Sequence, residues 1–316
     1  MNNQIILTIG IPTYNGANYI ANTINSILQE VEKNNLTNLE IVISDNCSTD
    51  NTQDVVSQFI NIPHLKIHYY KNSTNIGFDR NIDNVIKLAT GRYVWTLADD
   101  DYIINDGVTK VIKFLSINGV ELLFVNYSNA ININPNNTLY SNSNDFFRNI
   151  KFKNGLISSN IINRETWLTL DMARYFDSSW IHVAYSIEAL NPNKTSMAGI
   201  IVDNVLQMDG VPRWGENGSF IYTGFKLLDI FKRIPELNYD NDIKKLADFV
   251  IKGGYPKNLI IAKSQGFIVN NLVISRFKHY YRNYLSFWLI DLPILYLPKQ
   301  LCTLFIKLNK FFKKLF

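Results

Sequence analysis

Apolar runs of strand length alternate with helical repeats along the first 125 residues. The continuous apolar runs predict buried strands, and the segments after them have apolar residues three and four apart, which is typical of amphipathic helices. The strands are expected at residues 5–11, 39–43, 65–70, 93–97 and 120–125. The helices are expected from about 20 to 31, up to about 59, from 79 to 89 and from 106 to about 115. Repeated alternation with short connections predicts an α/β fold with a parallel, doubly wound sheet.

Several helix ends carry residues that commonly terminate helices. Asp106 is expected to cap the helix that follows it, and Ser48 or Asp50 the helix that ends near Phe59. Gly91 is expected as a C-terminal cap after residue 89.

The pattern changes after Tyr127. Residues 128–145 are rich in Asn and Ser and predict a long surface loop. A strand at 155–163, helices at 167–175 and 179–190, a strand at 199–207 and a loop at 208–219 are expected next. From residue 220 onward the segments look mostly helical. We therefore expect one α/β domain over residues 1–219, with halves 1–125 and 126–219, and a helical region over 220–316.

Composition changes this picture little. The 316 residues are 47% hydrophobic and 18% charged, which allows a large core, and the formal charge of +4 does not indicate a nucleic-acid partner. Cys47 and Cys302 lie far apart, so we expect neither a disulfide nor a cysteine metal site. We expect no signal peptide, because residues 1–4 lack a basic stretch and a strand follows at once.

Polar residues follow three of the predicted strands. The segment Pro12–Asn15, Asp45 and the triplet Asp99–Asp101 stand at carboxyl ends, where parallel α/β sheets bind ligands. Three adjacent carboxylates repel one another, and their oxygens suit Mg²⁺ or Mn²⁺ bridged to substrate phosphates. The alternative is a solvated acidic turn.

Two common nucleotide sites are excluded by their motifs. The chain has no G-x-x-x-x-G-K-[ST] loop, and its first turn is Pro-Thr-Tyr-Asn-Gly rather than G-x-G-x-x-G. A nucleotide-linked leaving group held by metal remains. Asp45 is then a candidate for base or ribose contacts, or a helix cap, and Arg80 is a candidate phosphate ligand, or a surface ion pair.

Five motifs in order carry a family resemblance. They are Ile11–Asn15, Ile43–Thr52, Asn75–Gly77 with Arg80-Asn81, Ala89–Tyr93 and Leu97–Asp101. Together they resemble family 2 glycosyltransferases of GT-A fold over roughly the first 125 residues. The resemblance implies a nucleotide-sugar-binding half at 1–125, an acceptor-side half at 126–219, and inverting transfer of a sugar from a nucleotide-diphospho-sugar with Mg²⁺ or Mn²⁺.

The resemblance also implies a set of site residues. Metal ligands are Asp99 and Asp101, with Asp100 as the alternative. Donor-binding residues are Pro12, Thr13, Tyr14, Asn15, Asp45, Asn75, Gly77, Arg80, Asp99, Asp100, Arg213 and Trp214. Asn46 departs from the family, which more often has Asp there. Ala98–Asp101 and Ser158–Asn160 are similar to the branch that includes abequosyltransferases of O-antigen synthesis.

Inversion needs a general base on the acceptor hydroxyl. The usual Glu-Asp pair of the family is absent, and Asp177 stands in the best corresponding position, with a helix N-cap as its alternative role. His182 is an alternative base or a further metal ligand, or a structural histidine.

The C-terminal stretch joins apolar and basic residues. Residues 284–298 are almost wholly apolar apart from Asp291 and Pro293, and the last stretch, from Lys299, carries five lysines and no acid. This predicts a membrane-associating amphipathic helix, or else a packed helix with outward lysines. We expect a peripheral enzyme on the cytoplasmic face of the inner membrane that glycosylates a lipid-linked saccharide and binds no nucleic acid.

Three alternatives to that expectation differ in chemistry. A processive synthase would carry clear transmembrane helices and a Q-x-x-R-W motif, but Arg213-Trp214 lacks the Gln. A non-catalytic nucleotide-sugar-binding relative would not need Asp177. A nucleotidyltransferase of related architecture would need a basic, Gly-rich N-terminal loop, which residues 10–18 are not.

Overall fold

The computed structural model divides the chain into two compact units. It describes residues 5–63, 65–134, 138–208, 220–252 and 255–315. The first unit comprises residues 1–210 and 233–243, and the second comprises residues 211–232 and 244–316. The predicted domain boundary at residue 219 falls outside the described residues.

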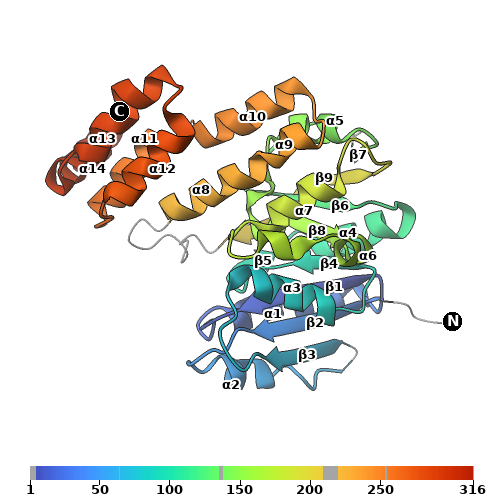
Figure 1. Cartoon of the computed structure of the whole chain (residues 1–316). Coiled ribbons are helices and arrows are strands. Elements are labelled where there is room, and N and C mark those ends of the chain that lie inside the picture. The colour runs from blue at the N-terminus through green and yellow to red at the C-terminus, as the bar shows by residue number, and fades with distance from the viewer. Residues whose placement is uncertain (1–4, 64, 135–137, 209–219, 253–254, 316) are drawn as a thin grey trace. The chain divides into compact units, whose positions relative to one another are not determined.

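The first unit is built on a nine-stranded mixed sheet (Figure 1). Its order is β3-β2-β1-β4-β8-β6-β9-β5, with β7 pairing β9. The strands are β1 (Leu7–Thr13), β2 (Leu39–Asp45), β3 (Lys66–Lys71), β4 (Tyr93–Thr96), β5 (Asp101–Ile103), β6 (Leu122–Tyr127), β7 (Leu139–Tyr140), β8 (Asn160–Asn163) and β9 (Ala198–Met208). The five strands expected before residue 126 are thereby confirmed, as is the strand expected at 199–207.

Helices flank this sheet on both faces (Figure 1). They are α1 (Ile20–Asn34), α2 (Thr52–Ser57), α3 (Phe78–Leu88), α4 (Gly107–Ile117), α5 (Ser143–Ile150), α6 (Arg164–Thr169), α7 (Ile181–Ala189) and α9 (Arg233–Glu236). Short 3₁₀ turns are η1 (Lys153–Gly155), η2 (Ile157–Ser159) and η3 (Met172–Tyr175).

Strand β1 is buried on both of its faces. Leu7, Ile9 and Ile11 join the apolar residues of α1 and α4 in one core cluster. On the other face, a Cβ at Gly10 would lie 2.2 Å from Cγ1 of Val85, so α3 packs directly on the backbone. The continuous apolar run of this strand follows from burial on both sides.

The sheet is parallel only in part. β3, β2, β1 and β4 run parallel, as do β6 and β9, whereas β8 runs antiparallel between β4 and β6, and β5 and β7 run antiparallel to β9. The sheet was expected to be mostly parallel and doubly wound, and it is mixed because β8, β5 and β7 form antiparallel pairs. In the sheet β8 lies between β4 and β6, although it follows both of them in the chain. Local periodicity carries no information about which strands become neighbours.

Two of the expected helix caps are wrong. The Asp106 side chain makes no cap hydrogen bond and instead pairs with Lys33 at 2.7 Å. Glu30 of α1 caps α4 from outside, because its two carboxylate oxygens accept from N–H of Gly107 and Val108, each at 2.8 Å. Helix α3 ends at residue 88, and Gly91 instead allows close approach, since a Cβ there would lie 2.7 Å from the Thr8 nitrogen.

The cap expected at Ser48 or Asp50 also differs. The N-cap position of α2 is Asn51, which makes no side-chain cap bond. Asp50 still accepts from N–H of Thr52 at 3.1 Å, so it satisfies a donor of the first turn from one residue further out.

Between residues 128 and 190 the helices and strands of the structure are shorter and more numerous than expected. The predicted loop contains β7 and the start of α5, and the predicted strand at 155–163 is strand only over β8. The predicted helix at 167–175 divides into α6 and η3, whereas the helix expected at 179–190 is α7.

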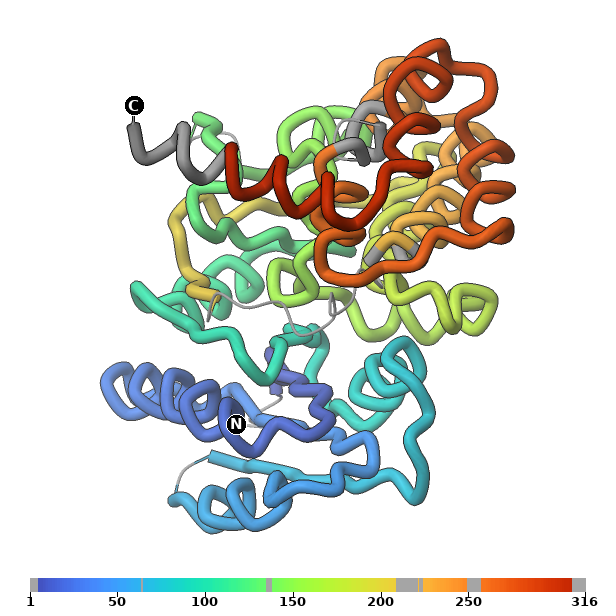
Figure 2. The backbone as a smooth tube through the Cα atoms, turned by 90° about the vertical axis from the view of Figure 1, so that its left-hand side faces the viewer, coloured from blue at the N-terminus to red at the C-terminus, as the bar shows by residue number. Residues whose placement is uncertain are grey.

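The second unit is helical, as expected from residue 220 onward (Figures 1 and 2). Its described helices are α8 (Phe220–Phe231), α10 (Asn241–Lys252), α11 (Tyr255–Ser264), α12 (Asn271–Tyr281), the π-helix η5 (Phe287–Asp291), α13 (Leu292–Tyr296) and α14 (Lys299–Leu315). Phe225 and Phe277 pack edge to face at 4.9 Å between ring centroids, and Phe277 and Phe287 are fully buried.

No single helix in the described part of the chain is long and apolar enough to cross a membrane. The helical segments 287–296 and 299–308 together have the length and apolar composition needed to cross a membrane, but they meet at a bend of 110°.

Candidate functional site

Polar side chains gather at one edge of the sheet. β1 and β2 are parallel and in register from Leu7 with Leu39 to Thr13 with Asp45, so both end at this edge. β8 is antiparallel to β4, so the segment before it, which includes Ser158, returns to the same edge. Asp101 pairs with Met208 at the end of β9. Figure 1 shows β1 to β4 side by side in this arrangement. We call this edge the carboxyl rim.

Asp45 lies fully buried at the end of β2. Its Oδ1 accepts from N–H of Ser48 at 2.7 Å, and its Oδ2 accepts from the hydroxyl of Tyr69 at 2.5 Å. Burial and the bond to Asp45 raise the pKa of Tyr69 well above its ordinary value, so Tyr69 stays a donor. Asp45 therefore stabilises the turn after β2 through these two hydrogen bonds.

The loop after β1 is fastened to the turn after β2. N–H of Asn15 donates to Oγ of Ser48 at 2.8 Å, and Oδ1 of Asn15 accepts from N–H of Thr49 at 2.9 Å. Asn15 adopts a left-handed φ of 53°, which asparagine tolerates better than most residues. Beside it, Pro12 is half-buried and Tyr14 is exposed. Two of the predicted donor loops thus form one structural unit.

The third donor loop joins this unit through amide side chains. Nδ2 of Asn46 donates to Oδ1 of Asn75 at 2.9 Å, and Oδ1 of Asn46 accepts from N–H of Ile76 at 2.9 Å. Oδ1 of Asn75 also accepts from N–H of Gly77 at 3.0 Å. Asn46 acts as donor and acceptor at once, which a carboxylate cannot do. This explains in physical terms why the chain has Asn at this position.

The acidic triplet places two buried carboxylates on the rim. Oδ2 of Asp99 accepts from the hydroxyl of Thr13 at 2.5 Å, and Oδ2 of Asp101 accepts from the hydroxyl of Ser158 at 2.5 Å. Asp99 and Asp101 are 5% and 4% exposed, whereas Asp100 is half-buried. The alternative of a solvated acidic turn is therefore wrong for Asp99 and Asp101, the two predicted metal ligands.

Gly16 leaves space that the first carboxylate occupies. A Cβ at this position would lie 2.3 Å from Oδ2 of Asp99 and 2.4 Å from Oγ1 of Thr13. N–H of Gly16 donates to Oγ1 of Thr52 at 3.0 Å, so the backbone is held in place. Any larger residue here would displace Asp99.

The donor set of the rim suits a hard divalent cation. No cluster of three or more His, Cys, Asp or Glu side chains in the described ranges is placed to hold a metal ion. Mg²⁺ and Mn²⁺ at nucleotide sites commonly take one or two carboxylates and complete their shell with phosphate oxygens and water. Asp99 and Asp101 fit that pattern, because each is a buried oxygen donor that a neighbouring hydroxyl group orients.

Arg80 and Asp177, which are 97 residues apart, form an ion pair. Nη1 and Nη2 of Arg80 donate to Oδ1 and Oδ2 of Asp177 at 2.5 and 3.1 Å. A Cβ at Gly77 would lie 3.9 Å from Oδ1 of Asp177, so the pair lies beside the loop of Asn75 and Gly77. The alternative of Asp177 as a helix N-cap is wrong, because Trp180 occupies that position.

His182 lies in the interior rather than on the rim. It is 3% exposed, and its Nε2 lies 3.0 Å from the carbonyl oxygen of Gly155. Burial lowers its pKa to about 4, so the imidazole is neutral at physiological pH. Of its three expected roles, the structural one agrees with this position, and the base and metal-ligand roles do not.

The remaining predicted residues and the unpredicted ones complete the site. Arg213 and Trp214 lie outside the described residues. Sequence reasoning missed Tyr69 and Asp79, and it noted Ser158 only as part of a family motif. Ser158 and Tyr69 contact the site through partners 57 and 24 residues away, and no local signal marks such pairs.

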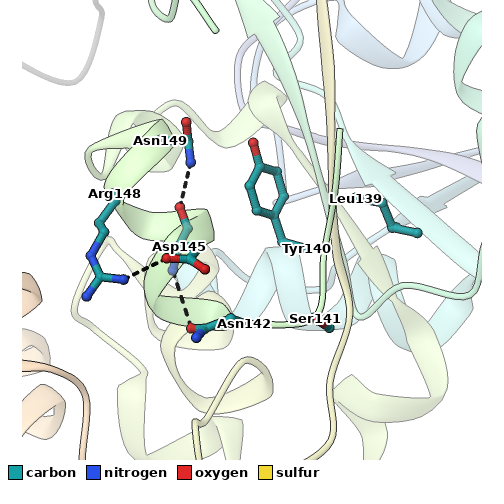
Figure 3. A pocket seen from close by; sticks show the side chains of 7 residues that line it. All are labelled: Leu139, Tyr140, Ser141, Asn142, Asp145, Arg148 and Asn149. Atoms are coloured by element: carbon teal, nitrogen blue, oxygen red, sulfur yellow. Dashed lines mark hydrogen bonds and ion pairs between the residues drawn. The ribbon is translucent and has the colours of Figure 1, made fainter. Parts of the chain in front are cut away.

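A hollow elsewhere in the first unit is not this site. A hollow of about 360 Å³ is lined by residues of β7 and α5 (Figure 3). Leu139 pairs with Gly199 near the start of β9, far along that strand from Met208 at the rim. Its polar groups serve the fold, since Oδ1 of Asn142 caps α5 and Arg148 pairs with Asp145. The carboxyl rim therefore remains the candidate site.

Comparison with known proteins agrees with this arrangement. Residues 8–173, just over half of the chain, match the sequence profile described as Glycosyl transferase family 2. The chain belongs to glycosyl transferase family 2. The matched residues include Asp45, Arg80, Asp99 and Asp101, whereas Asp177 lies just beyond them.

One relative indicates which branch of the family this chain resembles. Abequosyltransferase RfbV of Salmonella typhimurium is 30% identical over 257 residues, which cover 75% of this chain and 75% of RfbV. The resemblance of Ala98–Asp101 and Ser158–Asn160 to the abequosyltransferase branch is thereby confirmed.

Two solved glycosyltransferases share the fold. Residues 1–349 of TarS from Staphylococcus aureus align with a TM-score of 0.58 at 18% identity, covering 88% of this chain and 87% of TarS 1–349. The mannosyltransferase PcManGT from Pyrobaculum calidifontis, solved with GDP-Man and Mn2+, aligns with a TM-score of 0.57 at 16% identity, covering 95% and 87%. At these identities the likeness shows the mixed α/β fold alone.

Proposed function

We propose that this glycosyltransferase moves one sugar, with inversion, from a nucleotide-diphospho-sugar to a lipid-linked saccharide in bacterial surface-polysaccharide assembly. One observation carries the proposal: two buried carboxylates, Asp99 and Asp101, lie on the same rim as the fastened loops of Asn15, Asp45 and Asn75. A carboxylate pair suits a diphosphate with its cation, and the fastened loops form a wall for the nucleoside. The name of RfbV supports sugar transfer, and the complex of PcManGT with GDP-Man supports a nucleotide-diphospho-sugar as the donor.

The reaction that fits this geometry is a direct displacement. Asp177 takes the proton of the acceptor hydroxyl while the oxygen of that hydroxyl bonds to the anomeric carbon of the donor sugar. The bond from that carbon to the β-phosphate oxygen breaks, and the nucleoside diphosphate leaves with the electron pair. Attack from the face opposite the leaving group inverts the anomeric configuration.

The two buried carboxylates of the acidic triplet share one task in this proposal. Asp99 and Asp101 would hold Mg²⁺ or Mn²⁺, whose chemistry when bound is to offset the negative charge of the departing diphosphate. Thr13 and Ser158 keep these carboxylates oriented through their hydroxyl groups. His182 is not assigned to the base, because its Nε2 is used by the carbonyl of Gly155.

The acceptor and the place of work are proposed from the second unit. Nine large apolar side chains of residues 285–308 are each more than 40% exposed, and we call them the apolar tail surface. They are Leu285, Trp288, Leu289, Ile290, Tyr296, Leu301, Leu304, Phe305 and Leu308. Arg282, Lys299 and Lys307 are exposed nearby in sequence. Apolar surface combined with cationic side chains favours an anionic membrane, which is where a lipid-linked acceptor resides.

The direct test of the donor site is cation-dependent protection by a nucleotide. Thermal unfolding is followed with UDP, GDP, CDP or dTDP, each with Mn²⁺, because a ligand at 100 times its Kd adds about 2.7 kcal/mol. Transfer is then measured with the matching nucleotide-sugars. Asp101→Asn should remove both protection and transfer, because it keeps the volume but loses the charge. The matched control is Asp203→Asn, which removes an exposed carboxylate of β9 that pairs with Lys110. This variant should change neither protection nor transfer.

The donor assignment would be overturned by either of two results. One is full protection and full activity in both Asp99→Asn and Asp101→Asn. The other is an absence of protection by every nucleotide tested in the wild-type protein at millimolar concentration.

A further inference from the structure

The first turn of α3 reaches the segment that carries Asp177. Arg80 holds both carboxylate oxygens of Asp177, and the Phe176 ring lies against the same guanidinium, with Cζ 4.8 Å from the ring centroid. Bidentate pairing fixes the plane of a carboxylate as well as its position. Arg80 is therefore engaged by two neighbouring residues of one turn.

Asp79, the residue before Arg80, holds the backbone of that same turn. It is 2% exposed, and its carboxylate accepts from N–H of Ser179 at 2.8 Å and from N–H of Ile181 at 3.3 Å. Asp177 and Ser179 have left-handed φ values of 67° and 65°. Residues other than glycine rarely adopt such backbone conformations, which persist only where surrounding contacts determine them. Asp79 supplies those contacts.

An ordinary surface ion pair does not explain this arrangement. Exposed pairs contribute little to stability, and the side chains of Arg80 and Asp177 are 40% and 67% exposed. Here two successive residues of one helix converge on one strained turn, one on its side chain and one on its backbone. Contacts of that kind set the direction of a group more than they stabilise a fold.

We infer that Asp79 and Arg80 are positioning residues for Asp177, and that Arg80 serves this base rather than the donor diphosphate. The inference rests on the proposed function, in which Asp177 takes the acceptor proton. The two N–H donors of the guanidinium fix the position and the plane of the carboxylate. The expected role of Arg80 as a phosphate ligand is replaced by this one.

The test separates chemistry from donor binding. We expect Arg80→Gln to lower kcat for transfer by roughly 10²-fold, the scale of a general base, while the KM for the donor stays within about twofold. Arg80→Lys keeps the positive charge but loses the bidentate geometry of the guanidinium. Its kcat should therefore lie between those of Arg80→Gln and the wild-type protein. Arg148→Gln removes a guanidinium of similar exposure that is held by three carboxylates of the same unit, and it should leave both constants unchanged.

A double-mutant cycle shows whether Arg80 acts through Asp177. In an Asp177→Asn background, adding Arg80→Gln should lower the residual rate no further, since residues that act as a unit are not additive. Asp79→Asn should also lower kcat without raising the donor KM, and a thermal unfolding curve checks that each variant is folded.

Two results would overturn the inference while the proposed function stands. One is an Arg80→Gln variant with a raised donor KM, or weaker protection by the nucleoside diphosphate with Mn²⁺, at an unchanged kcat. The other is a double mutant in which the two losses multiply. A wild-type protein that transfers no sugar from any nucleotide-sugar would contradict the proposed function and this inference together.

Discussion

At the scale of single residues, His182 shows how burial changes chemistry. The unfolded chain holds this imidazole at a pKa near 6.5, whereas burial lowers the pKa in the fold to about 4. As the pH falls below 6.5 the unfolded chain therefore takes up a proton before the folded chain does. The stabilising contribution is complete above about pH 6.5 and is lost as the pH falls toward 4.

We predict that His182→Gln removes part of the acid sensitivity of the fold. The glutamine amide can donate to the Gly155 carbonyl but does not titrate. Between pH 7.5 and pH 5 the wild-type protein should lose about 2 kcal/mol more of unfolding free energy than the variant. Urea unfolding at the two pH values measures this difference, with the partly exposed His68→Gln as control. Equal losses in wild type and His182→Gln would show that His182 is not buried neutral.

At the scale of elements, α4 takes its cap from another helix. Both carboxylate oxygens of Glu30 accept from the first N–H groups of α4, although burial raises the pKa of this carboxyl. Asp106 occupies the N-cap position and yet makes no cap bond. A conventional capping residue therefore stands where its side chain does not cap.

We predict that Glu30→Ala destabilises the first unit by about 2 kcal/mol, because it leaves two buried N–H groups without acceptors. Asp106→Ala should cost clearly less than Glu30→Ala, because it removes an exposed ion pair with Lys33 and a long hydrogen bond from Asn34. Chemical denaturation of the two variants gives the comparison. The reverse order of stabilities would return the capping role to Asp106.

The same examples show how far sequence reasoning reaches. Strands such as β1 and β2 were predictable because continuous apolar runs record burial on both faces, and the acidic triplet was predictable as a site because it ends such a run. The insertion of β8, the cap by Glu30 and the pair of Arg80 with Asp177 depend on partners far apart in the sequence. Glu30 and Gly107 are 77 residues apart, Arg80 and Asp177 are 97 apart, and local patterns carry no record of such pairs. The site was therefore predictable as a set of residues but not as a set of contacts.

At the scale of the whole molecule, the apolar tail surface is the feature that calls for a partner. We predict that the full-length protein floats with anionic liposomes at low salt, and that deleting residues 299–316 or making Leu304→Ser with Phe305→Ser releases it. Each cation near an anionic surface contributes about 1 kcal/mol, and salt screens this attraction.

Matched controls make the membrane experiment specific. Ile117→Ser removes an apolar side chain that is 79% exposed in the first unit, and it should leave flotation unchanged. Transfer to a lipid-linked acceptor should fall more than donor hydrolysis in the released variants. A full-length protein that ignores anionic liposomes at low salt would exclude the membrane as the partner of this surface.

The place of β8 in the sheet has a consequence for synthesis on the ribosome. β4 ends at residue 96, but the strand that pairs with its free side ends at residue 163. At about 5–20 residues per second, several seconds pass before that strand is made. During this interval the backbone groups of Val94 and Trp95 form an open sheet edge in the nascent chain, and open edges invite aggregation. Ser158 arrives with the same segment, so Asp101 gains its hydroxyl partner only when the edge closes.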